Sequence, residues 1–388
     1  MQSQNKNFFI KGSGFKSIAM ALAIKKKFPY SKIILEKNKN FGGIYSGIKF
    51  KNFYLDIGCH LFDYTDEFFL NLFEINKKKI IPVQLEYKSL NNFGTTKGYA
   101  IYDFRNNKNI TKLQRSFLKN LKKNKNNSNI NLHSRYENKY GTEITKIIDK
   151  FCLKITGKKL KKINFHSDEF FMFDRILLFN TTISLKLKKK GLEDFLATPS
   201  RYNHDFSKGK IVFTFKNGTY GFIKHVLNLF KKKKIIFKNK YNIKNTRIIN
   251  PMANSNFLSN QLIDIPLHVI YLKCKKFRYT YFHDYTESPI FRVSSPGFYS
   301  KQYKNKYSYI CVEVPDPNYK YSKEFLIKYA IKYIEKYCKS EVLHYLFTKK
   351  SYPSIYKNYN GNKNYLLNPF IYSKKKLLKN IREYVDRF

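Results

Sequence analysis

The residues best suited to chemistry lie near the N-terminus, where glycines follow one apolar segment and an acid ends the next. Gly12, Gly14 and Ser17 follow the apolar run 8–10, and Glu36 lies 24 residues after Gly12. Backbone N–H groups at a helix N-terminus bind a phosphate group, provided that no side chain blocks its approach. A carboxylate about 20 residues further on accepts hydrogen bonds from an adenosine ribose. This spacing therefore predicts a dinucleotide site.

A strand, a helix and a second strand are needed to bring these residues together. Residues 8–10 and 33–35 are bulky and apolar, which is typical of buried parallel strands. Residues 16–28 carry small alanines that suit packing on a sheet, and Pro29 falls where such a helix ends. Ser17 is bulkier than the usual third glycine, which predicts a slightly wider gap between helix and strand. The glycine pattern also occurs in turns without a ligand, but its flanking elements favour a cofactor.

A second glycine pair and a later motif resemble those of a known superfamily. Gly42 and Gly43 follow Glu36, and the segment 56–62 reads D-I-G-C-H-L-F. This order resembles the FAD-dependent amine oxidase and protoporphyrinogen oxidase superfamily, which includes the UDP-galactopyranose mutases. The resemblance implies an α/β fold: a Rossmann-like FAD-binding domain with a βαβ unit and a mostly parallel sheet, and an inserted α+β substrate domain. Ile44 stands where the family often has Arg, which removes one expected phosphate contact.

The resemblance implies FAD as the cofactor, held non-covalently around the two glycine pairs. His60 is expected to face the flavin as a catalytic residue; a buried, hydrogen-bonded histidine near a strand end is the alternative. No metal site is predicted, because the histidines show no metal-ligand spacing. The residues expected to bind FAD are Gly12, Gly14, Ser17, Glu36, Gly42, Gly43, Ser46, Gly58 and His60.

Shorter matches later in the chain concern the substrate. The segment 199–203, P-S-R-Y-N, resembles the mobile loop of the mutases, and Arg292 lies in a segment similar to the family's substrate-facing strand. The guanidinium forks of Arg201 and Arg292 suit the pyrophosphate of a nucleotide sugar, with ordinary surface ion pairs as the alternative. Tyr356 is the third residue expected to bind substrate, although core packing is the simpler explanation in a chain with 32 tyrosines.

Three functions are compatible with the resemblance. The first is an FAD-dependent oxidoreductase that transfers a hydride from a substrate to the flavin, and the second is a flavin-dependent nucleotide-sugar mutase. The third is a degenerate flavoprotein fold without catalysis. The family closes with a G-D or G-R segment, but no glycine follows Gly361, and residues 374–388 are expected to form a basic amphipathic helix. We therefore expect FAD binding more firmly than activity.

The formal net charge of +48 by itself suggests a nucleic acid or an anionic membrane as partner. Only 10 of the 75 basic residues are Arg, the side chain whose fork suits bidentate phosphate contacts, and the lysines are spread along the chain. Abundant Lys, Asn, Ile, Phe and Tyr without Trp indicates a coding bias. We therefore expect non-specific attraction to polyanions and a small-molecule substrate that carries negative charge.

The five cysteines are widely spaced and lack a C-x-x-C motif, which predicts reduced thiols and a cytoplasmic protein, without zinc or a disulfide framework. No apolar run of 18 residues and no signal-peptide pattern is present, so no transmembrane segment is expected. The sequence gives no indication of the oligomeric state.

Composition and periodicity divide the chain further. The asparagine-rich region 105–133 is predicted to be a polar, loop-rich excursion. Helical spacing of apolar residues predicts mostly helix in 136–200, alternation predicts strands in 262–314, and 322–338 is a candidate amphipathic helix. The predicted FAD-binding domain is discontinuous and comprises residues 1–90, 205–255 and 350–388; the predicted substrate domain comprises residues 91–204 and 256–349.

Overall fold

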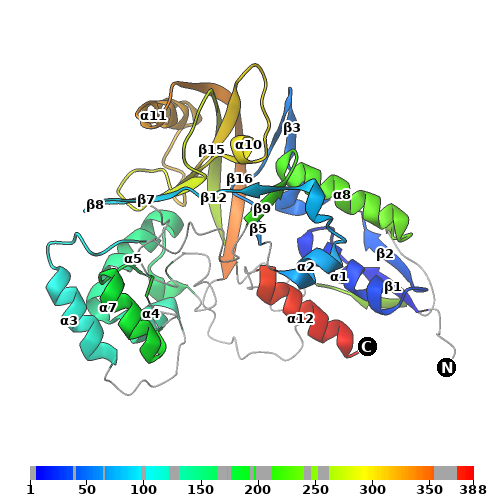
Figure 1. Cartoon of the computed structure of the whole chain (residues 1–388), viewed down its shortest axis with the longest axis horizontal. Coiled ribbons are helices and arrows are strands. Elements are labelled where there is room, and N and C mark those ends of the chain that lie inside the picture. Colours follow the sequence, from blue (N-terminus) through cyan, green and yellow to red (C-terminus); the bar gives the residue numbers. More distant parts are fainter. Residues whose placement is uncertain are drawn as a thin grey trace.

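The protein is described from a computed structural model of its 388 residues. Figure 1 shows a small sheet with helices at the right, a larger sheet in the upper centre, and a group of helices at the lower left. The residues that the structure describes are 6–37, 41–63, 66–97, 102–121, 131–163, 173, 176–192, 196–197, 212–239, 246–251, 262–353 and 374–388.

The small sheet is parallel and has the strand order β10-β2-β1-β11. β1 pairs in parallel with β2 on one side and with β11 on the other. Parallel neighbours need a crossover connection, and α1 provides it between β1 and β2. The predicted βαβ unit and the α/β fold class are therefore confirmed. The bounds are β1 Asn7–Ile10, α1 Phe15–Lys27, β2 Lys32–Glu36, β10 Ile236–Lys238 and β11 Thr246–Ile249.

Helices pack against this sheet around one aromatic and aliphatic core. In α1 the small residues Ala19 and Ala21 are fully buried, and the helix ends two residues before Pro29. The C-terminal helix α12 packs beside α1. The Lys27 Nζ at the end of α1 donates to the carbonyl oxygens of Val385 and Asp386 in α12, at 2.9 Å each. The predicted C-terminal amphipathic helix is thus confirmed. The other helices of this half are α2 Glu67–Leu72, α8 Gly218–Lys232 and α12 Lys374–Asp386.

The larger sheet has seven strands in the order β16-β12-β15-β14-β13-β7-β8. The inner strand β15 is buried along its whole length. Helix α11 covers one face of the sheet, and the hairpin β3-β4 packs on the other. The predicted strands in 262–314 and the helix in 322–338 are confirmed. The bounds are β7 Tyr87–Asn91, β8 Gly94–Lys97, β12 Leu262–Cys274, β13 Tyr281–Asp284, β14 Arg292–Ser294, α10 Pro296–Tyr299, β15 Ser308–Pro315, α11 Lys323–Glu335 and β16 Ser340–Pro353.

A group of helices with its own buried core packs next to the seven-stranded sheet. The prediction that 105–133 is loop-rich is wrong for its central part, which forms helix α3. Leu113 and Phe117 lie one turn apart and bury an apolar face, which outweighs the polar composition. The Asn107 side chain accepts a hydrogen bond from the N–H of Asn109 just before this helix begins. The helices are α3 Ile110–Leu121, α4 Leu132–Tyr140, α5 Thr142–Thr156 and α7 Thr181–Leu187.

The predicted domain divisions at residues 90/91 and 349/350 fall inside β7 and β16, respectively, and both strands belong to the seven-stranded sheet. A three-stranded sheet, with the order β5-β9-β6, packs on the same hydrophobic core as the parallel sheet. The remaining bounds are η1 Gly43–Tyr45, β3 Ile48–Phe50, β4 Phe53–Leu55, β5 Phe62–Asp63, η2 Lys77–Lys79, β6 Ile80–Val83, η3 Leu160–Lys162, η5 Lys188–Leu192 and β9 Val212–Phe215.

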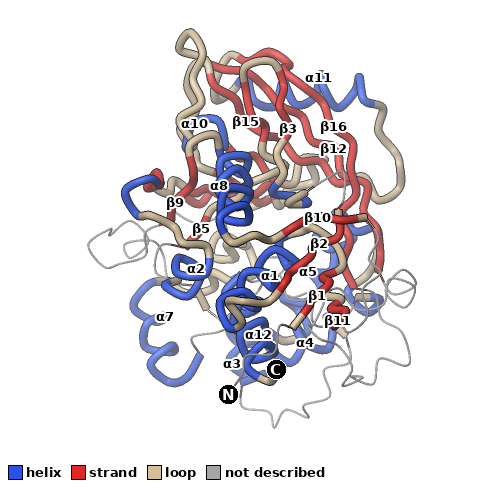
Figure 2. Tube along the Cα trace, turned by 90° about the vertical axis from the view of Figure 1, so that its right-hand side faces the viewer, coloured by secondary structure: helices blue, strands red, loops and turns tan. Residues whose placement is uncertain are grey.

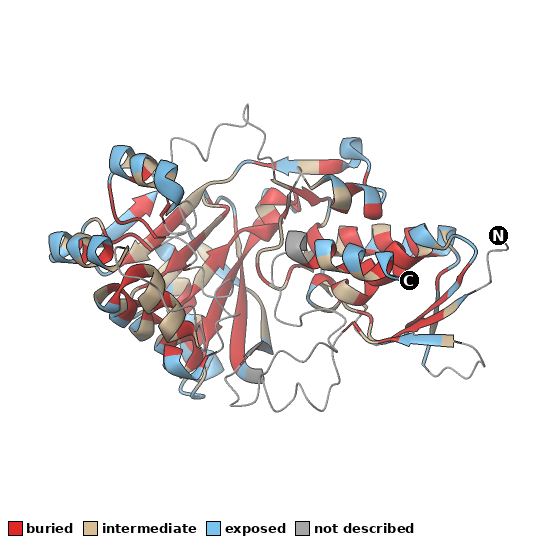
Figure 3. Ribbon diagram, turned by 90° about the horizontal axis from the view of Figure 1, so that it is seen from below, coloured by how far each residue is buried: buried red, intermediate tan, exposed pale blue. Residues whose placement is uncertain are grey.

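Helix α8 lies where the half of the molecule built on the parallel sheet meets the half built on the seven-stranded sheet. Figures 1 and 2 both place it between the parallel sheet and the seven-stranded sheet. Figure 3 shows buried residues concentrated along the strands and on the inner faces of the helices. Within the described parts of the chain, no helix is long and apolar enough to cross a membrane.

Close packing of α10 on β15 yields a first prediction. A Cβ added to Gly297 would lie 2.5 Å from the Ser308 Oγ and 2.7 Å from the backbone N of Tyr309. Since the backbone cannot move aside easily, we expect Gly297→Ala to lower the free energy of unfolding by about 1–3 kcal/mol. Denaturant unfolding followed by circular dichroism measures this.

Gly14→Ala is the matched control. Gly14 has an ordinary φ of −77°, and among the described residues no atom lies within 4 Å of a Cβ added there. Its free energy of unfolding should stay within about 1 kcal/mol of the parent value, the helix-propensity scale for such a change. Equal stability of the two variants would contradict the packing argument.

Candidate functional site

The first glycine turn and the acid that ends β2 contact each other directly. Gly12 has a φ of +75°, which favours glycine, and its N–H donates to the Glu36 Oε2 at 2.7 Å. The glycine turn and the acid, both expected at one dinucleotide site, therefore lie side by side. Ser17 donates from its Oγ to the carbonyl oxygen of Lys11 at 2.8 Å, so the hydroxyl ties α1 to the end of β1.

The N-terminus of α1 offers backbone N–H groups to a ligand. Gly14 is its N-cap, no described side chain caps it, and its first turn holds no acid. Such a terminus attracts an anion through its free N–H groups and its dipole. The open space beside the Gly14 Cα leaves room for a phosphate group to approach this backbone.

The second glycine pair lies back to back with the first. The Gly42 N–H donates to the carbonyl oxygen of Ser13 at 2.8 Å, and a Cβ on Gly43 would lie 3.7 Å from the Gly14 Cα. Gly42 and Gly43 have φ values of +94° and +60°, so both positions favour glycine. The Ser13 Oγ is buried without a hydrogen-bond partner among the described residues.

The turn after the second pair completes this surface. Ser46 ends η1 and donates its N–H to the carbonyl oxygen of Gly43. Ile44, at the position where the family often has Arg, has 57% of its surface exposed. The two turns form a side-chain-free cradle that a Cβ would fill, and these residues fit a pyrophosphate group well. Burial lowers the pKa of Lys16, in the first turn of α1, to about 8.

Asp56 holds the start of α8. Its Oδ1 accepts hydrogen bonds from the N–H and the Oγ1 of Thr219, both at 2.9 Å, whereas its Oδ2 has no partner among the described residues. Burial raises the pKa of Asp56 to about 7, and the two Thr219 bonds oppose that shift. Gly218 has a φ of +60°, and a Cβ there would collide with the Asp56 carboxylate. Sequence reasoning did not identify Thr219 as a partner of Asp56, because the two residues are 163 positions apart.

Gly58 lies directly over a buried ion pair. Arg292 donates from Nε and Nη2 to the two carboxylate oxygens of Glu313, at 2.6 and 2.9 Å. A Cβ on Gly58, whose φ is +91°, would lie 3.0 Å from the Arg292 Nη2. A side chain at position 58 would crowd the Arg292–Glu313 ion pair, so this position favours glycine. Glu313 was missed from the sequence, since only the register of β14 with β15 brings it opposite Arg292.

His60 follows this loop and lies beside η1, the turn that begins at Gly43. Its Nε2 lies 2.7 Å from the carbonyl oxygen of Ile57, which can only accept, so Nε2 carries the hydrogen. Its ring lies 4.8 Å from the ring of Tyr45 in η1. Cys59 is beside it, with the Tyr299 hydroxyl 3.7 Å from its Sγ, and burial raises the pKa of this thiol to about 11.

The other two predicted substrate-binding residues, Arg201 and Tyr356, lie outside the described residues. In the described part of the chain, no group of three or more His, Cys, Asp or Glu side chains has the arrangement of a metal site. The structure therefore brings Gly12, Gly14, Ser17, Glu36, Gly42, Gly43 and Ser46 together, and Tyr45 connects them to Gly58 and His60.

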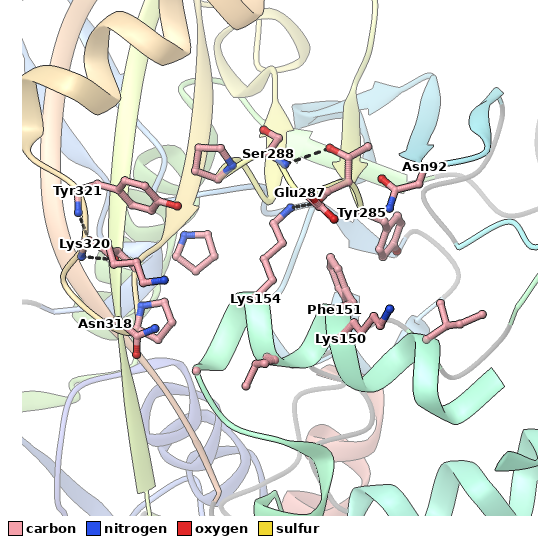
Figure 4. Close-up of a pocket in the computed structure, with 18 of the residues that line it drawn as sticks. Asn92, Lys150, Phe151, Lys154, Tyr285, Glu287, Ser288, Asn318, Lys320 and Tyr321 are labelled. Atoms are coloured by element: carbon pink, nitrogen blue, oxygen red, sulfur yellow. Dashed lines mark hydrogen bonds between the residues drawn. The ribbon is translucent and has the colours of Figure 1, made fainter. Parts of the chain in front are cut away.

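A separate cavity of about 500 Å³ lies between α5 and the loops that leave β13 and β15 (Figure 4). Lys154 reaches across it and donates from Nζ to the carbonyl oxygens of Asp284, Thr286 and Ile290 at 2.8–3.0 Å. Burial lowers the pKa of Lys154 to about 8. Because an ammonium has three donors and all are used, Lys154 fastens the loop to α5.

Comparisons with known proteins support this reading of the fold. No protein-family model matches the sequence, and no curated protein matches it. Solved structures do match. Reduced UDP-galactopyranose mutase has a TM-score of 0.62 at 12% identity, over 99% of this chain and 87% of that one.

Two further structures match over 99% of this chain and 98% of theirs, each with a TM-score of 0.61. A protein assigned as a protoporphyrinogen oxidase from Exiguobacterium sp. 255-15 has 10% identity, and cyclohexylamine oxidase from Brevibacterium oxydans IH-35A has 9%. At these identities the likeness concerns the fold. The chain has the fold that these three proteins share, in agreement with the fold that the motif resemblance predicted.

The buried Asp56 carboxyl yields a prediction about pH. In the unfolded chain an Asp ionises near pH 4, whereas in the folded protein Asp56 holds its proton up to about pH 7. Its contribution to stability is full below pH 4 and is lost as the pH rises to 7. The test compares the free energies of unfolding of the parent and of Asp56→Asn. The parent value minus the variant value should fall by up to about 4 kcal/mol as the pH rises from 4.5 to 7.5.

Urea unfolding at a series of pH values measures this difference. Asp103→Asn is the control, because Asp103 is also buried but hydrogen bonds from Arg105 and Thr96 overcome burial and hold its pKa below the usual value. Its contribution is lost as the pH falls, which is the opposite sign. A difference for Asp56→Asn that is flat or rises with pH would contradict a raised pKa.

Proposed function

We propose that this chain is an FAD-binding oxidoreductase of the amine oxidase and protoporphyrinogen oxidase type. The observation that carries the proposal is the cradle of two back-to-back glycine turns at the N-terminus of α1, with Glu36 against Gly12. Sequence motif and backbone geometry agree at this point, in a chain with the fold of that superfamily. When bound, FAD would supply the redox chemistry, and the protein would supply position and electrostatics.

Each part of the cradle has a separate task in this proposal. The N–H groups at the start of α1 and the glycines around Gly14 and Gly43 would hold the pyrophosphate. Glu36 would accept hydrogen bonds from the ribose hydroxyls while it keeps the Gly12 turn in place. Ser46 would support the turn that follows the second glycine pair. The orphaned Ser13 Oγ, buried at the same place, is a further donor for this group.

The reactive end of the cofactor would lie toward Gly58 and His60. The hydrogen bond from His60 Nε2 to the Ile57 carbonyl oxygen fixes the imidazole ring and its tautomer. The buried Arg292–Glu313 ion pair beneath Gly58 places two fixed opposite charges at this end of the site. Because Glu313 takes up two nitrogens of Arg292, the guanidinium has less charge to offer an anionic substrate than its position in the sequence suggested.

The net charge of +48 would draw in an anionic cofactor or a small anionic substrate. The same charge would give weak, salt-sensitive binding to polyanions as a by-product. Rates of association with the cofactor should therefore fall as ionic strength rises, because exposed charges are screened over about 10 Å at 0.1 M salt.

A flavin-dependent nucleotide-sugar mutase is the second candidate. It is favoured by the match to reduced UDP-galactopyranose mutase over 99% of this chain. In this function Arg201, Arg292 and Tyr356 would bind the nucleotide sugar. A degenerate flavoprotein fold without catalysis is the third candidate.

Purification followed by reconstitution with FAD separates these candidates. Bound FAD that is released on denaturation supports the first two. Bleaching of the flavin by amines or porphyrinogens under anaerobic conditions supports the oxidoreductase. Turnover of a UDP-sugar only after dithionite reduction supports the mutase. A protein that is colourless and takes up no FAD refutes both.

Gly14→Ala tests the cradle itself. The added methyl meets no described atom of the chain, but it occupies the space through which the pyrophosphate would approach. We expect the variant to fold like the parent and to bind FAD at least about tenfold more weakly, an effect of about 1.4 kcal/mol. Fluorescence titration of FAD measures the affinity. Unchanged affinity in a folded variant would place the cofactor elsewhere.

Glu36→Gln tests the ribose contact with a side chain of the same size. The amide oxygen can still accept from the Gly12 N–H, but the negative charge toward the ribose hydroxyls is lost. We expect FAD to bind about 3- to 30-fold more weakly, equivalent to roughly 0.7–2 kcal/mol, and Glu36→Ala to be weaker still. Glu67→Gln, at an exposed acid in the first turn of α2, is the control.

A further inference from the structure

Two of the five cysteines lie side by side at one end of the seven-stranded sheet. Cys274 is the last residue of β12, and Cys338 follows α11 in the turn that leads to β16. Cys274 is the register partner of Ser340, only two residues beyond Cys338. Both are free thiols in the structure, and they belong to one side-chain cluster, in which Cys338 packs against the buried core that contains Cys274.

The two thiols differ in their access to solvent. Cys274 is fully buried, whereas Cys338 is partly exposed and lines a groove of about 660 Å³. An arrangement with one accessible thiol and a second directly behind it is typical of redox-active pairs. The accessible sulfur can react first, and the buried sulfur is already within reach of the product.

The groove is strongly basic. Its lining contains five cations and a single acid, Glu341, which is paired with Lys273 at 2.7 Å. Arg278 is paired with Glu86 from a neighbouring segment at 2.9 Å. Even after these two pairs the groove keeps an excess of positive charge, which attracts small anions. The cations that line it are Lys273, Lys275, Lys276, Arg278 and Lys339.

The remaining thiols are in different surroundings. Burial raises the pKa of Cys59, Cys152 and Cys311, so these thiols stay protonated and unreactive. The neighbouring Cys274 thiol lowers the pKa of Cys338. The dipole of α11, whose C-terminus is close by, opposes a thiolate there, and the lysines of the groove favour it.

We propose that Cys338 and Cys274 form a redox-active dithiol that is oxidised by a small anionic disulfide bound in the basic groove. The Cys338 thiolate attacks one sulfur of the disulfide, so that a mixed disulfide forms and one thiolate leaves. Cys274 then attacks the Cys338 sulfur, which releases the second thiolate, and the Cys274 proton passes to that departing thiolate. The protein dithiol is oxidised by two electrons, and the small disulfide is reduced to two thiols.

The new bond would fasten the turn between α11 and β16 to the end of β12. β16 is the edge strand of the sheet, and this turn precedes it directly. A cross-link here closes a long loop, from residue 274 to residue 338, which restricts the unfolded chain. Oxidation should therefore raise the Tm of the protein, and reduction should restore the original value.

The test uses the full-length protein as purified, with glutathione disulfide as the anionic probe and hydroxyethyl disulfide as the neutral one. We expect the number of titratable thiols in the denatured protein to fall from five to three. Peptide mass spectrometry should find Cys274 linked to Cys338. Cys274→Ser should stop at a glutathione adduct on Cys338, and Cys338→Ser should show neither product.

Cys152→Ser is the matched control, because it removes a buried thiol elsewhere and should leave the Cys274–Cys338 link intact. Lys339→Glu should slow oxidation by glutathione disulfide about threefold or more, with little effect on the neutral probe. A count that stays at five, a link to any other cysteine, or equal slowing with both probes would overturn the proposal.

Discussion

Asp56 is the point at which the two halves of the molecule are joined. Its carboxylate binds the N-terminus of α8 through Thr219, and its backbone is bound by two tyrosines of the seven-stranded sheet. The Asp56 N–H donates to the Tyr309 hydroxyl at 3.0 Å, and the Tyr271 hydroxyl donates to the Asp56 carbonyl oxygen at 3.0 Å. Hydrogen-bond partners stabilise a buried polar group, so this network favours one relative position of helix and sheet.

The candidate site depends on that position. Two residues beyond Asp56, Gly58 lies against the Arg292–Glu313 pair of the seven-stranded sheet, and His60 then turns back to Tyr45 beside the glycine cradle. The cradle belongs to the parallel sheet, whereas the ion pair belongs to the larger sheet. A chain segment of only a few residues therefore connects the part suited to a pyrophosphate with the part suited to a reactive ring. Its course is fixed by Asp56 at one end and by His60 at the other.

Local elements explain why the first part of this arrangement could be predicted from the sequence. The contact of Gly12 with Glu36 follows from a single βαβ unit, whose turn, helix and strand occupy one short segment. The Arg292–Glu313 pair depends on the register of β14 with β15, which no local pattern fixes. The bond of Asp56 to Thr219 joins residues 163 positions apart. Long-range pairings of this kind follow from the complete fold, so sequence reasoning found the motif residues without their partners.

The loss of sequence similarity has a physical explanation in the way the core is built. Around the start of α1, the ring of Phe15 lies 5.1 Å from Tyr45, 5.6 Å from Phe73 and 6.2 Å from Phe222, so aromatic rings fill much of this core. A core tolerates extensive exchange of apolar side chains if its total volume and pattern are kept. Lysines on the surface are exchanged even more freely, because isolated surface changes cost little.

Backbone conformation does not tolerate such exchange. Gly12, Gly42 and Gly58 all have positive φ values, and added side chains at Gly42 and Gly58 would also meet Ile223 and Arg292. A biased composition can therefore replace the core with Phe and Tyr and the surface with Lys and Asn, but it cannot replace these glycines without strain. This explains why the glycines, and the residues at fixed spacing from them, still indicate the fold. Sequence identity to the matching structures is only 10–12% and does not indicate it by itself.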